Sequence, residues 1–174
     1  MKRALQVLLL TSAMAFVFQT NEVKAQRPTY QLHSMLIFNF IKYIEWPAEA
    51  KSGDFIIAVY GDDDVFEELN KLYGGKSVKG QSVKVVNINK AVELNEAHLI
   101  YLADNKSNDF DEVLAVASGK PTLLITDRNG LGEKGSNINF KTVGGKLKFE
   151  INQAAFDKNS LKVSSQLVSM AIVI

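Results

Sequence analysis

Residues 122–152 read TLLITDRNGLGEKGSNINFKTVGGKLKFEIN, and this stretch decides the fold. Residues 122–126 form an apolar run that ends at a turn, which predicts a buried strand. Residues 137–141 and 146–151 are separated by a short glycine turn, and the second of them alternates apolar with charged side chains. We therefore expect these two segments to pair as an antiparallel hairpin beside the buried strand.

A glycine-rich loop inside this stretch has the spacing of a dinucleotide-binding motif. Gly130, Gly132 and Gly135 match G-x-G-x-x-G, and Glu150 follows roughly where a ribose-binding carboxylate is expected. A dinucleotide site also needs a helix that begins at the loop, whereas residues 136–140 have strand character. We interpret the segment as an inter-strand loop whose glycines adopt positive φ values, and we expect no nucleotide cofactor.

Strands and helices alternate upstream of this stretch. Residues 55–60 are a near-continuous apolar run, typical of a central strand that is covered on both faces. Asp62 or Asp63 is placed to cap a helix that runs through Tyr73. The further elements expected here are two strands (82–87 and 99–102) and a helix (109–117). The order predicts an α/β fold, a three-layer sandwich with a mostly parallel sheet, helices on both faces and a C-terminal antiparallel hairpin.

The chain after this hairpin is predicted to be helical. Residues 153–158 form a short helix, and Ser164 is placed to cap a last helix. The apolar side of that last helix would run from Leu167 to Ile172. Because the chain stays apolar up to Ile174, we expect this end to be docked on the domain.

Residues 1–25 have the features of a secretory signal peptide. A basic start at Lys2 and Arg3 precedes a mostly apolar segment, and Ala25 stands where signal peptidase would cut. We therefore expect an exported, periplasmic protein with one domain at residues 26–174 and no membrane insertion after cleavage. The apolar segment is short for a spanning helix, although an uncleaved anchor stays open as an alternative.

Charge and cysteine content exclude several classes of function. Residues 1–25 hold three basic residues and one acidic residue, so the rest of the chain holds 17 basic and 18 acidic residues. A net charge near −1 gives no general attraction to nucleic acid or anionic lipid. The chain has no cysteine, which excludes disulfides, thiolate metal sites and cysteine nucleophiles.

The first structured segment, residues 30–45, is a helix with more apolar area than one face requires. Nine of the thirteen residues from Leu32 to Ile44 are large and apolar, and Pro47 limits the helix at its C-terminal end. Two interpretations stay open: the helix is covered on both sides within the domain, or it offers a surface to a partner or a second copy. The partner-binding residues predicted under the second interpretation are Phe40, Tyr43, Ile44 and Trp46.

The sequence contains no motif that predicts an enzyme or a metal centre. His33 and His98 are the only histidines, and nothing in their spacing makes them neighbours. The acidic run at residues 62–64 lacks the glycine and distal glutamate of a calcium loop, and no nucleophile elbow or phosphate loop is present. A weaker hypothesis places a small-ligand pocket at Asp127, Arg128 and Asn129, because open α/β sheets bind ligands at the ends of their strands.

The chain resembles the YfiR family of exported regulatory proteins over nearly all of residues 26–174. The order and phrasing of several segments carry the resemblance, and they are FNFIKYIEWP (38–47), IAVYGD (57–62), GK (75–76), HLIY (98–101), LITD (124–127), GSNINF (135–140), KFEIN (148–152) and LKVSSQL (161–167). The resemblance implies a three-layer α/β domain, often dimeric, without catalytic activity or cofactor.

The resemblance also implies a mechanism based on protein–protein contact. The family's best-known members restrain a membrane-bound diguanylate cyclase from the periplasm, and an envelope signal releases the enzyme by a population shift. Redox-sensitive cysteines of better-known members have no counterpart here, so redox-triggered release is not expected. The resemblance implies a membrane-anchored signalling partner and a homodimer. A structural component of the envelope and a small-ligand sensor domain remain as alternatives.

Overall fold

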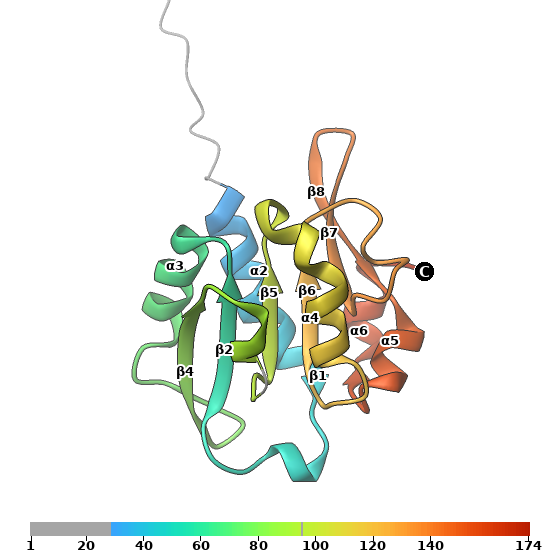
Figure 1. Cartoon of the computed structure of the whole chain (residues 1–174). Coiled ribbons are helices and arrows are strands. Elements are labelled where there is room, and N and C mark those ends of the chain that lie inside the picture. The colour runs from blue at the N-terminus through green and yellow to red at the C-terminus, as the bar shows by residue number, and fades with distance from the viewer. Residues whose placement is uncertain (1–28, 95) are drawn as a thin grey trace, which may run out of the picture.

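The computed structural model describes residues 29–94 and 96–174, so the predicted signal peptide lies outside the described residues. An eight-stranded sheet in the order β10-β8-β7-β6-β5-β2-β4-β3 forms the centre of the fold. Helices lie on both faces of this sheet (Figure 1). In the described part of the chain, no helix has both the length and the apolar character that crossing a membrane requires.

The parallel part of the sheet consists of five neighbouring strands. β2 (Phe55–Tyr60) is central and pairs in parallel with β4 (Gln81–Ile88) and β5 (Leu99–Leu102). β6 (Leu123–Thr126) pairs in parallel with β5 on one side and with β7 (Ile138–Val143) on the other. The carboxyl ends of these strands therefore meet at one edge of the sheet.

The remaining strands complete the two ends of the sheet. β7 and β8 (Lys146–Ile151) form the expected antiparallel hairpin, with Phe140 opposite Phe149. β10 (Ile172–Val173) adds in parallel to β8, and β3 (Ser77–Val78) adds antiparallel to β4. The predicted three-layer α/β sandwich with a mostly parallel sheet and a C-terminal antiparallel hairpin is confirmed.

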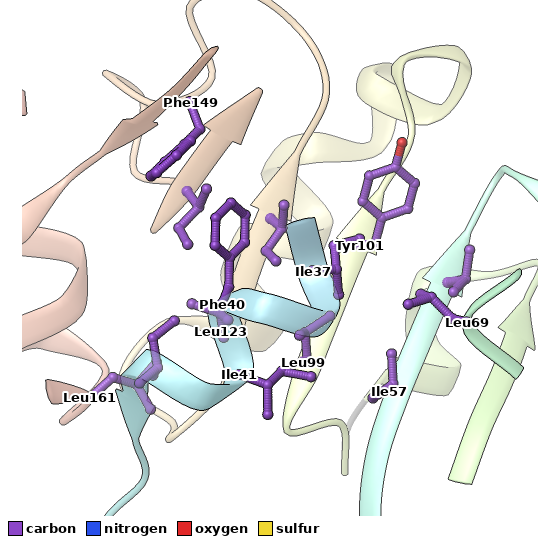
Figure 2. Packing of buried hydrophobic residues seen from close by; sticks show 14 of the residues in the cluster. Ile37, Phe40, Ile41, Ile57, Leu69, Leu99, Tyr101, Leu123, Phe149 and Leu161 are labelled. Carbon is purple, nitrogen blue, oxygen red and sulfur yellow. The ribbon is translucent and has the colours of Figure 1, made fainter. Parts of the chain in front are cut away.

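Alternating side chains of the central strands pack into two separate hydrophobic cores, one on each face of the sheet. Ile57 and Val59 point to the face that is covered by α2 (Thr29–Tyr43) and α3 (Asp63–Tyr73). α5 (Gln153–Lys158) and α6 (Ser165–Val168) extend the helical layer on the same face. Figure 2 shows α2 lying across the strands, with Phe40 and Ile41 packed toward them.

The opposite face of the sheet is covered by a smaller layer. Ala58 and Tyr60 point to this side, where they meet α4 (Phe110–Ala117) and the short helical turn η2 (Ala91–Leu94). A strand with both faces covered is expected to be apolar throughout. This explains why β2 and β5 contain no charged residue.

The first helix ends two residues earlier than predicted. α2 ends at Tyr43, and β1 (Ile44–Glu45) pairs antiparallel with β9 (Lys162–Val163) in a separate two-stranded sheet. Pro47 limits how far a helix can run, but it does not determine where the helix ends. Pairing with a segment distant in sequence takes Ile44 and Glu45 out of the helix, a tertiary contact that the local pattern does not contain.

The predicted last helix is largely wrong. Ser164 caps α6 as expected, since its Oγ accepts a hydrogen bond from the backbone N–H of Leu167 at 3.2 Å. The helix nevertheless ends at Val168, and Ile172 lies in β10, paired with Glu150 of β8. The spacing of the apolar residues fits a helix, but the free edge of β8 offers backbone hydrogen bonds that favour a strand.

The expected positive φ values are found at only two of the three motif glycines. Gly130 has φ +87° and Gly135 has φ +118°, whereas Gly132 lies outside the left-handed region. Position 132 favours glycine for a different reason, which is lack of space for a side chain. A Cβ atom there would lie 2.8 Å from Glu150 Oε2 and 2.9 Å from Ile174 Cδ1. The segment after the loop enters β7, so no helix N-terminus is available for a pyrophosphate.

Candidate functional site

A polar cavity lies at the carboxyl edge of the sheet, where the parallel strands β5, β6 and β7 end. It has a volume of about 350 Å³. Asp104 follows β5, Asp127 follows β6, and Lys141 belongs to β7, so three neighbouring strands each place a charged side chain there. The other lining residues are Thr29, His33, Arg128, Asn129, Phe140, Thr142 and Leu147. Open α/β sheets commonly bind ligands at this edge.

The three residues predicted for a ligand pocket all line this cavity. Asp127 is half-buried, and Arg128 and Asn129 are exposed on the loop that follows β6. The Arg128 guanidinium donates a hydrogen bond to Ser107 Oγ, and its Nε lies 3.7 Å from Asp104 Oδ1. These contacts hold Arg128 beside the cavity. Binding of a ligand by these residues stays a prediction.

His33 and Asp127 line the cavity, and both contact the buried Tyr101. His33 Nδ1 lies 3.0 Å from Tyr101 Oη and 3.5 Å from Asp127 Oδ2, and Tyr101 Oη donates to the same carboxylate oxygen at 3.3 Å. The His33 ring stacks on Phe140 at 4.2 Å with an interplanar angle of 1°. His33 Nε2 is buried and has no hydrogen-bond partner among the described residues.

Burial shifts the protonation of this His33, Tyr101 and Asp127 cluster toward the uncharged forms. It lowers the pKa of His33 to about 4 and raises the pKa of Asp127 to about 6. The nearby carboxylates of Asp104 and Asp62 raise the pKa of Asp127 further, whereas the hydrogen bond from Tyr101 opposes this rise. Burial also raises the pKa of Tyr101, so its phenol stays neutral and donates. At neutral pH the cluster therefore carries one negative charge, on Asp127, beside a neutral imidazole.

Cationic and anionic side chains both line the cavity. Lys141 Nζ donates to Glu150 Oε1 at 2.6 Å, and Arg128 supplies a second cation. Asp104 and Asp127 supply the anionic groups, and Asp104 Oδ1 lies 3.7 Å from Arg128 Nε. Only Asp127 of the buried cluster is partly exposed, at 29% of its side chain, whereas His33 is 2% exposed. The cavity therefore offers side chains of both charges, with only Asp127 of the His33, Tyr101 and Asp127 group reaching it with a partly exposed side chain.

A second, acidic cavity of about 580 Å³ shares Asp104 and Asp127 with the first. The acidic run after β2, residues 62–64, lines it. Asp62 caps α3, since its Oδ1 accepts from the backbone N–H of Val65 at 2.9 Å, which confirms the predicted capping role. Within residues 29–94 and 96–174, no group of three or more His, Asp or Glu side chains is placed to hold a metal ion.

Three of the four residues predicted to bind a partner lie inside the protein. Phe40, Ile44 and Trp46 are buried in the core between α2 and the sheet. Trp46 also donates from Nε1 to the backbone carbonyl of His98 at 3.2 Å. These three side chains cannot form a surface contact in this fold, so that part of the prediction is corrected. Tyr43 is half-buried and still reaches the surface.

The sequence interpretation missed His33 and Lys141 as lining residues of the cavity, and Tyr101 as the hydrogen-bonding partner of His33 and Asp127. His33 lies one helical turn before Ile37 and two before Ile41, on the buried face of α2, which was the available signal for its burial. Tyr101 has the single polar tip in an otherwise apolar strand. Neither signal shows that the two residues meet, because their contact depends on how α2 lies across the sheet.

The family model described as YfiR/HmsC-like matches residues 30–172. The chain belongs to the YfiR/HmsC-like family. The resemblance found in the sequence is thereby confirmed. The best-known YfiR-like proteins are periplasmic regulators in diguanylate cyclase signalling, and the family is regulatory and non-catalytic in character. No curated protein is similar enough to this chain to count as a match.

The solved structures that are similar to this YfiR/HmsC-like chain include the following two. One is described as the ABC domain in complex with L-Trp from Streptococcus pneumonia, with a TM-score of 0.52 and 14% identity over 83% of this chain. The other is a conserved domain protein from Vibrio cholerae O1 biovar El Tor, with a TM-score of 0.47 and 13% identity over 83% of this chain. The chain spans 60% of the length of each. At this level of identity the first similarity supports the fold alone.

Proposed function

We propose that this chain is a non-catalytic, exported regulatory protein that restrains a membrane-bound signalling enzyme of the diguanylate cyclase type through protein–protein contact. The family match over residues 30–172 is the observation that carries this proposal. An envelope signal releases the enzyme to the extent that it favours the unbound form of the regulator. A homodimer is part of the proposal, and four exposed apolar side chains near β10 support it: Met170, Ile172, Val173 and Ile174.

The contact surface for the enzyme is assigned to the outward stripe of α2, defined here as Met35, Asn39, Lys42 and Tyr43. Met35 is 39% exposed although it is large and apolar, and Tyr43 is half-buried one helical turn after Asn39. Aromatic and methionine side chains are enriched in interface centres, while a polar rim is common around them. The stripe therefore replaces the buried residues Phe40, Ile44 and Trp46 as the candidate surface.

The test measures cyclic di-GMP in the producing bacterium. Deletion of the gene is expected to raise the cyclic di-GMP level, and wild-type protein restores it. The Met35→Glu, Tyr43→Ser double variant is expected to accumulate in the periplasm without restoring the level. Val92→Glu is the matched control, since Val92 is 63% exposed and belongs to η2 on the opposite face of the sheet. An unchanged cyclic di-GMP level after deletion would refute the proposal.

A second function, sensing of a small ligand, is supported by the cavity that collects Asp127, Arg128 and Asn129. The opposed charges favour a zwitterion whose carboxylate meets Arg128 and whose ammonium meets Asp104 or Asp127. A thermal-shift panel of amino acids, vitamins and anions tests this function, because a ligand that binds the folded state stabilises it. L-Trp belongs in the panel, as the ligand named for the streptococcal protein of similar fold.

The matched variants for this panel are Arg128→Gln and Lys146→Gln. Both residues are exposed, but only Arg128 lines the cavity. A ligand that acts at this site stabilises the wild type and Lys146→Gln but not Arg128→Gln. If no compound of the panel shifts the unfolding temperature, the proposed ligand sensing at this cavity is refuted.

A further inference from the structure

Another concave site lies on the helical face between α2, the end of α3 and β3, and it shares no residue with the carboxyl-edge cavity. Its volume is about 390 Å³. Four apolar or aromatic side chains form its wall, and they are Phe38, Ile41, Tyr73 and Val78. Three lysines and Ser77 complete the lining, and the lysines are Lys42, Lys76 and Lys79. We refer to this site as the lysine groove.

An aromatic pair forms the wall of the lysine groove. The rings of Phe38 and Tyr73 lie 5.0 Å apart with an interplanar angle of 47°. Tyr73 is buried, and its Oη donates to the backbone carbonyl of Phe38 at 3.4 Å. Burial raises the pKa of Tyr73, so the phenol stays neutral. Phe38 is only half-buried, and it presents an apolar ring to the groove.

Two ammonium groups lie over the Phe38 ring. Lys42 Nζ is 4.4 Å from the ring centroid, and Lys76 Nζ is 5.7 Å from it. The ring face attracts both cations by a cation–π interaction, but it does not neutralise their charge. Lys42 additionally donates to Asn39 Oδ1, a neutral acceptor, at 3.2 Å. The two cations therefore remain available to an anion.

The third cation is held at the rim by the turn between β3 and β4. Lys79 has φ +50° and is followed by Gly80 with φ +89°. A left-handed backbone conformation costs free energy in a lysine. It occurs here because Lys79 and Gly80 are the two central residues of a two-residue hairpin turn. The turn thus fixes the backbone of Lys79 beside the groove. No carboxylate holds Lys79 in this position, because Lys79 forms no ion pair within the described chain.

The lysine groove differs in this respect from the sites of Lys84 and Lys141. Lys84 is paired with Asp54 at 2.6 Å, and Lys141 is paired with Glu150 at 2.6 Å. In the described part of the chain, none of the three groove lysines has a carboxylate within 4.0 Å. Three like charges around an apolar hollow repel one another, and an anion that enters the hollow relieves this repulsion.

We propose that the lysine groove binds a soluble amphiphilic anion, a carboxylate, phosphate or sulfonate carried on an apolar or aromatic body. The apolar body packs against Phe38 and Val78, and the anionic group lies among the ammonium groups. The occupant is a single small molecule and not a bilayer, because the deepest lining residues, Ile41 and Tyr73, are buried and out of reach of a flat surface. The lysine groove shares Lys42 with the outward stripe of α2, but the inference does not rest on the proposed cyclase regulation.

Titration calorimetry with the folded domain tests the chemistry of the ligand. The probes are 8-anilinonaphthalene-1-sulfonate and octanoate, the latter below its micelle concentration, with octanol and inorganic phosphate as partial ligands. Saturable 1:1 binding of both anions is expected. Octanol should bind more weakly because it lacks the anionic group, and phosphate because it lacks the apolar body. Binding of the anions should weaken as salt is added. Equal affinity for octanol and octanoate would overturn the proposal.

Matched double variants test the location of the site. Lys76→Gln with Lys79→Gln removes two exposed groove lysines and is expected to weaken octanoate binding about fivefold or more. Lys146→Gln with Lys148→Gln removes two exposed lysines from the β7–β8 hairpin and should leave the affinity unchanged. Equal loss in both double variants indicates nonspecific charge attraction and overturns the site.

Chemical protection gives a readout that does not depend on a variant. Octanoate should slow acetylation of Lys76 and Lys79 in the wild-type protein, as measured by mass spectrometry, without slowing acetylation of Lys146 and Lys148. Vesicles of phosphatidylglycerol form the last arm. Protection of the groove lysines by vesicles, with none by octanoate, would assign the site to a lipid surface and refute the small-molecule proposal.

Discussion

His33 Nδ1 lies 3.5 Å from Asp127 Oδ2, although the two residues come from the first helix and from the loop after β6. Burial lowers the pKa of His33 to about 4 and raises the pKa of Asp127 to about 6. Between these values the pair holds one proton, on the carboxyl group. The two shifts have opposite effects on stability between pH 4 and 6, so they largely cancel in the wild-type protein.

The His33→Phe variant should reveal the contribution of Asp127. The phenyl ring can keep the stacking on Phe140, and Tyr101 can still donate to Asp127. Between pH 3.8 and about 6 the folded carboxyl keeps a proton that the unfolded one has lost. The free energy of unfolding should therefore fall by up to about 3 kcal/mol as pH rises through this window. Urea unfolding at pH 4.5 and pH 7 measures the change.

The Asp127→Asn variant should show the opposite slope. Only His33 then titrates, and between about pH 4 and 6.5 the unfolded imidazole binds a proton that the folded one lacks. The free energy of unfolding should rise by up to about 3 kcal/mol as pH rises through this window. Wild-type protein measured in parallel should have a flatter profile than either variant. Parallel profiles for all three proteins would show that the two groups do not titrate as described.

The elements predicted correctly are those whose pattern is complete within one segment. β2 at residues 55–60 and α3, capped by Asp62, agree with the sequence prediction because a covered strand and an amphipathic helix leave local periodic signals. β1 and β10 were missed because each is two residues long and depends on a distant partner, β9 and β8 respectively. Their sequences alone fit a helix equally well.

The candidate cavity was predictable only in part, for the same reason. Asp127, Arg128 and Asn129 follow a buried parallel strand, and that position points to the ligand-binding edge of a sheet. His33 and Lys141 reach the cavity through the crossing of α2 and the register of β7 on β6. Neither the crossing nor the register can be read from the residues around them.

Gly132 provides a test of close packing against Glu150 of β8. A Cβ atom in Gly132→Ala would meet Glu150 Oε2 at 2.8 Å. Glu150 cannot easily move, because it is 2% exposed and accepts hydrogen bonds from Asn139 at 2.9 Å and Lys141 at 2.6 Å. The variant should lose about 1–3 kcal/mol of stability in urea unfolding, the usual range for overpacking.

A double-mutant cycle separates this clash from a backbone effect. Glu150→Asp shortens the side chain, so the loss caused by Gly132→Ala should be smaller in that background. Gly130→Ala is the control, since its added Cβ meets no atom within 4 Å and its cost comes from φ +87° alone. The cost of Gly130→Ala should be the same in both backgrounds. A Gly132→Ala loss that does not depend on residue 150 would contradict the steric explanation.

Substitution of Trp46 tests whether the large apolar residues at and after the end of the first helix belong to the core. The side chain is 3% exposed, its ring meets Phe55 edge-on at 4.9 Å, and its Nε1 donates to His98 O. Trp46→Ala should therefore lose about 3–5 kcal/mol of stability, as large-to-small core substitutions do. Tyr43→Ala, at a half-buried position, should lose clearly less.

Circular dichroism is the appropriate probe, because Trp46 is the only tryptophan and its removal abolishes tryptophan fluorescence. The comparison also separates stability from binding. A variant with Tyr43→Ala should stay folded and weaken contact with the proposed partner enzyme, while Trp46→Ala should weaken that contact only to the extent that it unfolds. If Trp46→Ala proves as stable as the wild type, the indole is not a core residue, and its original interpretation as a partner anchor would have to be restored.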